Sequence, residues 1–271
     1  MLESAAMLSA RRWLGPLAVC GAALAMLLWS AGTWPDAIVD FGRELYVPWQ
    51  LAQGKVLYRD IAYQNGPLSP YWNRLWFAVL GVSLRTLVVA NLAAMAALLV
   101  LLDRLLREMA GALAATLGGL TFVLLFGFAQ LIPIGNYNWL CPYSHEMTHG
   151  VLLSLAALYA LWRSRASSRP RLWAALAGVA LGLAFLTKVE VFVAAFAAVA
   201  ALLLAGLLAG RDEAKRTALP LAAGLLAPPL VAWALLALAM PAGAALIGTL
   251  GSWAHLSYAE AAGERFYQAG A

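Results

Sequence analysis

Two histidines and a glutamate stand at a spacing that can do chemistry in the segment 133–150. His145, Glu146 and His149 form a His-Glu-x-x-His pattern, and Pro142 lies just before it. Proline is favoured in the first turn of a helix, and helical residues four apart share one face. Both imidazoles are therefore expected to point the same way. In zinc peptidases, this arrangement holds the metal through two histidines while the glutamate activates water.

A zinc site of this kind needs a further protein ligand, and the sequence offers Glu190 or Asp40 for that place. Three interpretations stay open. The first is a membrane zinc peptidase. The second is a site that binds another divalent ion or substrate hydroxyl groups through His145 and His149. The third is a hydrogen-bonded helix start with no chemistry of its own.

The composition indicates which solvent surrounds these groups. Of the 271 residues, 63% are hydrophobic and 11% are charged, whereas a soluble domain is about 25% charged. Lipid must therefore cover most of the chain. The net charge of +5 does not indicate nucleic acid, because the basic residues stand in short clusters between apolar runs. The two cysteines, Cys20 and Cys141, predict neither a disulfide nor a thiolate metal site.

Seven segments are apolar and long enough to suggest membrane spans, since a spanning helix needs about 20 residues. A single helix over 172–210 would be about 58 Å long, so we expect a turn at 187–190. The first run follows Arg11 and Arg12 and is longer than the apolar part of a cleaved signal peptide, so it is expected to be retained. The predicted fold is an all-α polytopic membrane protein with about seven transmembrane helices, approximately 13–34, 86–103, 109–132, 142–162, 172–187, 191–210 and 217–241.

Basic clusters predict the orientation in a cell (inner or plasma) membrane. They stand at 11–12, 104–107, 163–171 and 211–216, and an even number of expected spans separates each cluster from the next. The positive-inside rule then places all four clusters and the N-terminus in the cytoplasm, and the C-terminus outside.

The longest external segment is the loop 35–85. It is expected to hold an amphipathic helix at 41–53 and an apolar-aromatic segment at 71–84 that lies along the interface. The segment 242–271 is expected to be an external tail, or the start of a missing region.

Charged residues also mark the external ends of the expected spans. Asp40 follows the first span, Glu146 opens the fourth, and Lys188 and Glu190 stand at the top of the 172–210 hairpin. Charges at membrane depth are expensive and are usually functional. Because three separate segments carry them at the same depth, the sequence predicts a polar site at the external face.

The first external loop resembles that of the GT-C glycosyltransferases of family 39, the protein-mannosyltransferase-like group. The resemblance rests on the spacing from Asp40 to Gly54, and on the segments Leu57-Tyr58-Arg59-Asp60 and Gly182-Leu183-Ala184-Phe185-Leu186-Thr187-Lys188. Further matches are Pro67, Gly81 and Arg85. The resemblance covers most of residues 30–190. Phe41 departs from it, because an acidic residue often follows the first one in that family. The chain is also shorter than most members, as a fragment or a minimal core would be.

The resemblance implies sugar transfer, with inversion, from a polyprenyl-phosphate donor to an acceptor at the external face. Asp40 would be the general base that takes the acceptor's proton. The departing polyprenyl phosphate would need cations, for which the candidates are Lys188, Arg43, Lys55 and Arg59. An acceptor or metal site would comprise His145, Glu146, His149 and Glu190, with Glu44, Asp60 and Tyr143 as further pocket candidates. The implied partners are the lipid-linked sugar and membrane lipid, and a divalent metal is an optional cofactor.

A lipid or sugar flippase, or another transporter, is the remaining alternative. Such proteins place ionisable groups and broken helices near the middle of the membrane. Five of the expected spans carry no charge, and Pro228-Pro229 is the strongest internal helix break. This pattern argues against ion-coupled transport and leaves lipid flipping open.

Overall fold

The structure is a computed structural model and describes residues 2–34, 41–128 and 138–255. Within these ranges every regular element is helical, and the one β-type contact is an isolated bridge between Leu57 and Ile61. The prediction of an all-α protein is confirmed.

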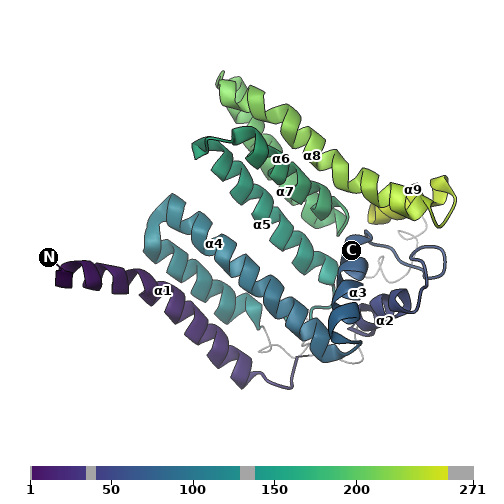
Figure 1. Cartoon of the computed structure of the whole chain (residues 1–271), viewed down its shortest axis with the longest axis horizontal. Coiled ribbons are helices and arrows are strands. Elements are labelled where there is room, and N and C mark those ends of the chain that lie inside the picture. Colours follow the sequence, from purple (N-terminus) through teal and green to yellow (C-terminus); the bar gives the residue numbers. More distant parts are fainter. Residues whose placement is uncertain (1, 35–40, 129–137, 256–271) are drawn as a thin grey trace, which may run out of the picture.

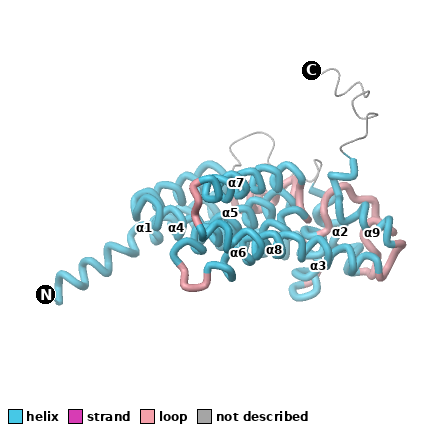
Figure 2. Tube along the Cα trace, turned by 90° about the horizontal axis from the view of Figure 1, so that it is seen from above, coloured by secondary structure: helices cyan, strands magenta, loops and turns pink. Residues whose placement is uncertain are grey.

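The long helices run along one direction, and three short ones gather at one end (Figures 1 and 2). The short ones are α2 (Phe41–Ala52), α3 (Leu68–Leu80) and α9 (Ala242–Leu250). The others are α1 (Leu2–Trp29), α4 (Leu84–Thr121), α5 (His145–Ala166), α6 (Pro170–Phe185), α7 (Val189–Leu208) and α8 (Asp212–Ala237). A π-helical turn, Phe122–Gly127, continues α4, and a 3-10 turn, Gly251–His255, follows α9.

Helix α4 consists of two arms that meet at Gly111. This residue has φ 90° and ψ 179°, a conformation that glycine adopts readily and other residues avoid. Figure 1 shows the ribbon turning back on itself within α4. The reversal lies slightly beyond the 103–109 boundary expected from the sequence.

In the part of the chain that the structure describes, three helical segments are long and apolar enough to cross a membrane: Leu84–Gly127, Val189–Leu208 and Ala214–Ala237. The first contains the reversal at Gly111 and so comprises both arms of α4. Shorter apolar helices cover Trp13–Trp29, Pro170–Phe185 and Ala242–Ala254. These helices support an integral membrane protein, and the number of seven spans stays a prediction.

Small residues let α6 and α8 approach closely. A Cβ atom added to Gly178 would meet the backbone of Leu221, and one added to Gly224 would meet the backbone of Ala175. In membranes, where lipid is as apolar as leucine, close backbone approach of this kind stabilises helix pairs through van der Waals contact.

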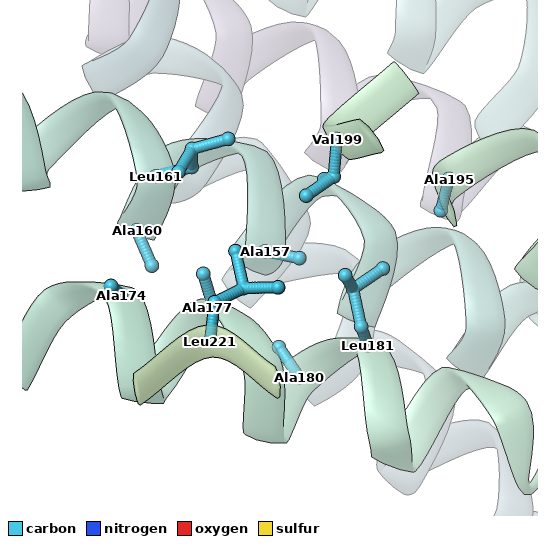
Figure 3. Packing of buried hydrophobic residues seen from close by; sticks show 10 residues of the cluster. All are labelled: Ala157, Ala160, Leu161, Ala174, Ala177, Ala180, Leu181, Ala195, Val199 and Leu221. Carbon is cyan, nitrogen blue, oxygen red and sulfur yellow. The ribbon is translucent and has the colours of Figure 1, made fainter. Parts of the chain in front are cut away.

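A cluster of buried apolar side chains joins four helices (Figure 3). Its members are Ala157, Ala160 and Leu161 of α5, Ala174, Ala177, Ala180 and Leu181 of α6, Ala195 and Val199 of α7, and Leu221 of α8. This packing fixes the middle of α5 against α6, α7 and α8 and so helps to place its first turn.

The loop between α2 and α3 is fastened to the turn between α6 and α7. The backbone N–H of Gly66 donates to the Thr187 carbonyl at 2.9 Å, and that of Leu68 to the Leu186 carbonyl at 3.0 Å. No side chain fits at Gly66, because its Cβ would meet the backbone of Leu186. These contacts set α3 beside the start of α5.

The segment expected to be a tail begins with α9. Ala245 of α9 is buried against Leu236 of α8 and Met240. The Ser252 hydroxyl then donates to the Asn65 amide oxygen at 2.9 Å. At least the first part of 242–271 is therefore packed against the end of the protein where α2 and α3 lie.

Candidate functional site

A buried polar cluster occupies the first turn of α5. His145 and Glu146 are fully buried, and His149 is 5% exposed. The helix begins directly after Ser144, whose backbone is extended. The two imidazole rings stack, with centroids 5.8 Å apart and an interplanar angle of 18°, so they share one helical face as the spacing predicted.

His145 is the centre of this cluster. Its Nδ1 lies 2.6 Å from Oε2 of Glu44 on α2, and its Nε2 lies 2.7 Å from Nδ2 of Asn91 on α4. The Asn73 amide of α3 lies 3.1 Å from the same Nδ1. With Nδ1–H donating to the carboxylate, Nε2 accepts from Asn91. Side chains from four helices thus meet at one imidazole.

The carboxylate of Glu44 is shared between His145 and Arg43. Oε1 of Glu44 accepts from Nη2 and Nε of Arg43 at 2.6 and 3.1 Å. Burial by itself would raise the pKa of Glu44, but the charge and hydrogen bond of His145, and then those of Arg43, hold this pKa below its usual value. Glu44 is therefore ionised at neutral pH.

Arg43 connects this carboxylate to a second one. Its Nη2 lies 3.6 Å from Oε2 of Glu146, and it donates to the Tyr143 carbonyl at 3.3 Å. The same Glu146 oxygen accepts a hydrogen bond of 2.6 Å from the Ser144 hydroxyl, while Oε1 has no partner among the described residues. The Arg43 side chain is 42% exposed, so the cluster is open to the outside at this cation.

His149 belongs to the cluster through its ring but differs in its surroundings. Its Nδ1 lies 2.9 Å from the Ser69 hydroxyl of α3, and its Nε2 has no partner among the described residues. The Trp72 ring stands edge-on to the imidazole at a centroid distance of 6.5 Å. His149 therefore faces the apolar side of α3, whereas His145 faces the charges.

This geometry gives the zinc peptidase interpretation no support. Both ring nitrogens of His145 have protein partners, and Nδ1 of His149 lies at the Ser69 hydroxyl. Among the described residues, no three histidine, cysteine, aspartate or glutamate side chains converge as a metal site requires. Of the two proposed further ligands, Glu190 is 67% exposed and lies 3.9 Å from Lys188, and Asp40 lies outside the described residues.

Lys188 stands at the edge of the cluster, with its Nζ 5.6 Å from the centroid of the Tyr143 ring. Three other predicted site residues lie elsewhere. Arg59 pairs with Asp60 at 2.9 Å and donates to the Ala239 carbonyl, and Lys55 is exposed near this pair. These contacts connect the loop to the end of α8, so Lys55, Arg59 and Asp60 are not members of the polar cluster.

The carboxyl of Asp60 titrates as part of this separate pair. Hydrogen bonds from Arg59 and then from the backbone N–H of Val56 lower the pKa of Asp60 to about 2.

The sequence-based prediction missed the uncharged members of the cluster, among them Asn73, Asn91 and Ser69. Their signal was present, because an amide inside an apolar run needs a partner away from lipid. Asn91 interrupts the run 86–103 in this way, and its amide also donates to the Leu140 carbonyl at 2.9 Å.

Cys141 lies next to the cluster in an apolar setting. It is fully buried and packs with Phe41, Phe77, Leu87 and Val88. Burial raises the pKa of the Cys141 thiol to about 12. In this arrangement the thiol is protonated and is not an activated nucleophile.

A family model described as transmembrane exosortase matches residues 138–256, somewhat less than half of the chain. The match begins at the segment that carries Cys141, His145 and His149. No curated protein and no solved structure matches the chain. The match to a transmembrane family and the apolar helices together identify the chain as a membrane protein.

The match overturns the glycosyltransferase prediction. The resemblance to family 39, the inverting sugar transfer with Asp40 as base, and the polyprenyl-phosphate donor are wrong, because the family that matches is an exosortase. A transmembrane exosortase is also neither a flippase nor a zinc peptidase.

The segments that carried the resemblance have structural roles of their own. Gly182 lies against Pro228, the Thr187 hydroxyl donates to the Ala184 carbonyl at 2.5 Å at the end of α6, and the Leu186 carbonyl holds the loop. Such short motifs recur wherever a helix ends in a tight turn, so their order alone did not identify a family.

Proposed function

We propose that this chain is a membrane-embedded, cysteine-type transpeptidase of the exosortase kind, which acts on a polypeptide at the external face. The observation that carries the proposal is the buried Glu44–His145 pair, 2.6 Å apart, at the start of the matched segment. Cys141, the one cysteine in that segment, stands four residues before His145.

The arrangement follows the logic of a nucleophile, a base and an orienting carboxylate. Glu44 holds Nδ1–H of His145, so that Nε2 can take the thiol proton once its hydrogen bond from Asn91 opens. Asn91 ties the two parts together, because its amide contacts both His145 Nε2 and the Leu140 carbonyl. The base and the backbone next to Cys141 are thus held by one side chain.

The reaction would proceed through a thioester. The Cys141 sulfur, deprotonated by His145, bonds to a peptide carbonyl carbon. The C–N bond breaks, and the leaving amine takes the proton from the imidazolium. An acceptor amine then attacks the thioester, which releases the thiolate, and the acceptor's proton returns to the cysteine through His145. The proton count and the bond count balance over the cycle.

The described arrangement is a resting one. Phe41 packs against Cys141 and stands edge-on to the His145 ring at a centroid distance of 6.3 Å. The proposal requires a bound substrate to shift Phe41 so that the thiol can leave its apolar site and reach Nε2. This requirement matches the high pKa of the buried thiol, which keeps it unreactive towards water and small thiols.

A hydroxylamine assay tests the mechanism without knowledge of the substrate. Hydroxylamine cleaves thioesters, so membranes that contain the active chain should yield polypeptides with a new C-terminal hydroxamate, detectable by mass spectrometry. Cys141→Ala should abolish these products, whereas Cys20→Ala, on an exposed helix face, should leave them unchanged. Hydroxamates that persist in Cys141→Ala, or that are missing from the wild-type membranes, would refute the mechanism.

We also propose that the N-terminus is cytoplasmic, that the C-terminus is external and that seven spans cross the membrane. The support is the placement of the four basic clusters. Alkaline phosphatase fused after residue 85 should be active, and the same enzyme fused after residue 107 should be inactive. The opposite pattern would invert the topology and remove the polar cluster from the external face.

A further inference from the structure

A cavity of about 440 Å³ lies between α3, α4, α5 and α6, next to the polar cluster. The indole rings of Trp72 and Trp76 form one wall, and small side chains of α4, including Ala93 and Ala97, form another. His149 lines it as well, and the rest of its lining is apolar. Its volume lies within the range of about 300–1,000 Å³ that is usual for small-molecule sites.

The cavity has one unsatisfied polar group. The His149 side chain is almost fully buried, its Nδ1 is taken by Ser69, and its Nε2 has no hydrogen-bond partner among the described residues. A buried nitrogen left in this state carries an energetic cost, because it has lost its hydration without gaining a hydrogen bond. A ligand that brings a hydrogen-bonding group to Nε2 would remove this cost.

The cavity opens towards lipid. Trp72 is 44% exposed, and Ala93 and Ala97 are exposed as well. They belong to the interfacial helix α3 and to the first arm of α4, which is among the helices apolar enough to cross a membrane. A molecule already dissolved in the bilayer could therefore enter from the side.

We propose that this cavity binds one hydrocarbon chain of a membrane amphiphile, with a neutral hydroxyl or carbonyl group at His149 Nε2. The apolar walls exclude a charged head group, because an unpaired ion would lose its hydration there. An α-helix with its side chains is about 10–12 Å across, too wide for a cavity of this volume, whereas a single alkyl chain is slender. The inference does not depend on the thioester chemistry proposed above.

Photolabelling tests the proposal in the full chain reconstituted into phosphatidylcholine nanodiscs. The probe is a C16 alcohol that carries a diazirine near the end of its chain, and the comparison probe is the same diazirine alkane without the hydroxyl. We expect saturable labelling by the alcohol in peptides of α4 and α5 that include Ala97 or Leu152.

Two variants and a matched control distinguish binding of the hydrocarbon chain from the hydrogen bond to His149 Nε2. Ala97→Leu fills the cavity and should weaken saturable labelling at least about fivefold. Ala96→Leu makes the same change at an exposed neighbour outside the lining and should have no effect. His149→Leu should weaken labelling by the alcohol about two- to tenfold while leaving labelling by the alkane unchanged.

Three results would overturn the proposal. The first is saturable labelling of the Ala97→Leu variant as strong as that of the wild-type protein. The second is equal saturable labelling by the alcohol and the alkane in the wild-type protein. The third is saturable labelling confined to α8 near Val231 and Leu235, which line a separate apolar cavity of about 420 Å³. Activity in the hydroxylamine assay is a separate readout, so failure of one proposal does not imply failure of the other.

Discussion

Replacement of Glu44 by glutamine should destabilise the protein through loss of one negative charge. Glu44 is 4% exposed and accepts hydrogen bonds from His145 and Arg43. A hydrogen bond to a charged group contributes about 1.5–3 kcal/mol, and the half-exposed Arg43 adds about 0–1 kcal/mol after solvent screening. We therefore expect a loss of about 1.5–4 kcal/mol of unfolding free energy. At about 2–4 °C per kcal/mol, the midpoint should fall by about 3–16 °C.

The buried thiol provides the assay. In a Cys20→Ala background Cys141 is the remaining cysteine, and it is fully buried in the folded protein. A maleimide dye that fluoresces on reaction will report its exposure as detergent-solubilised protein is heated. Glu190→Gln makes the same chemical change at a side chain that is 67% exposed, and it should change the unfolding free energy by no more than about 0.5 kcal/mol.

The pH dependence follows from the lowered pKa of Glu44. Because this pKa is lower in the folded than in the unfolded protein, the contribution to stability is complete above the ordinary value of about 4.3 and is lost as the pH falls through the folded value. The midpoints of wild type and Glu44→Gln should thus differ at pH 7 and converge as the pH falls below about 4. An unchanged midpoint at pH 7, or an equal loss in Glu190→Gln, would refute the assignment of a charged, buried Glu44.

Two further outcomes are expected. Gly178→Ala should lower the unfolding free energy by about 1–3 kcal/mol, because the added Cβ meets the backbone of Leu221. Gly21→Ala is the control and should not lower it, because no atom lies within 4 Å of the new Cβ. Equal thermal midpoints for the two variants would contradict the close packing of α6 on α8. In folded Cys20→Ala protein without substrate, a maleimide at pH 8 should leave Cys141 unmodified, because burial raises the pKa of this thiol to about 12. Rapid modification, detected by mass spectrometry, would show that the thiol is accessible without substrate.

The helical architecture could be predicted because it depends on local sequence. The lengths of the apolar runs predicted most of the long helices, and the turn expected at 187–190 falls where α6 ends and α7 begins. The reversal in α4 was placed too early. The basic residues near Arg107 suggested a loop, whereas the chain continues as a helix with an Asp103–Arg107 pair and turns at Gly111. A glycine in an apolar run gives no clear sign of whether it bends the chain.

The site could be predicted in part. Charge and spacing indicated His145 and Glu146, and the resemblance to family 39 added Arg43 and Glu44; these four side chains lie together. The resemblance also suggested Lys55, Arg59 and Asp60, but the loop turns away, and Arg59 pairs with Asp60 near the end of α8. Which polar groups meet depends on contacts between distant helices, and these cannot be read from spacing within one loop.

The family prediction failed for a related reason. Motifs such as Gly182 to Lys188 reflect how a helix ends and packs, which many membrane proteins share. Cys141 was considered only for a disulfide or a thiolate metal site, although His145 follows it four residues later. The contact that the sequence did not indicate is that of Asn91, whose amide joins the Leu140 carbonyl to His145.

The bond between Asn91 and His145 also has a consequence for biogenesis. During synthesis, the first arm of α4 leaves the ribosome and can enter the bilayer before α5 exists, so its amide has no partner at that stage. Arrival of the α5 histidine supplies the partner, and the buried imidazole in turn needs the amide. Each helix therefore makes the insertion of the other more favourable, and a nascent chain halted between them would expose a polar defect that quality-control proteases could recognise.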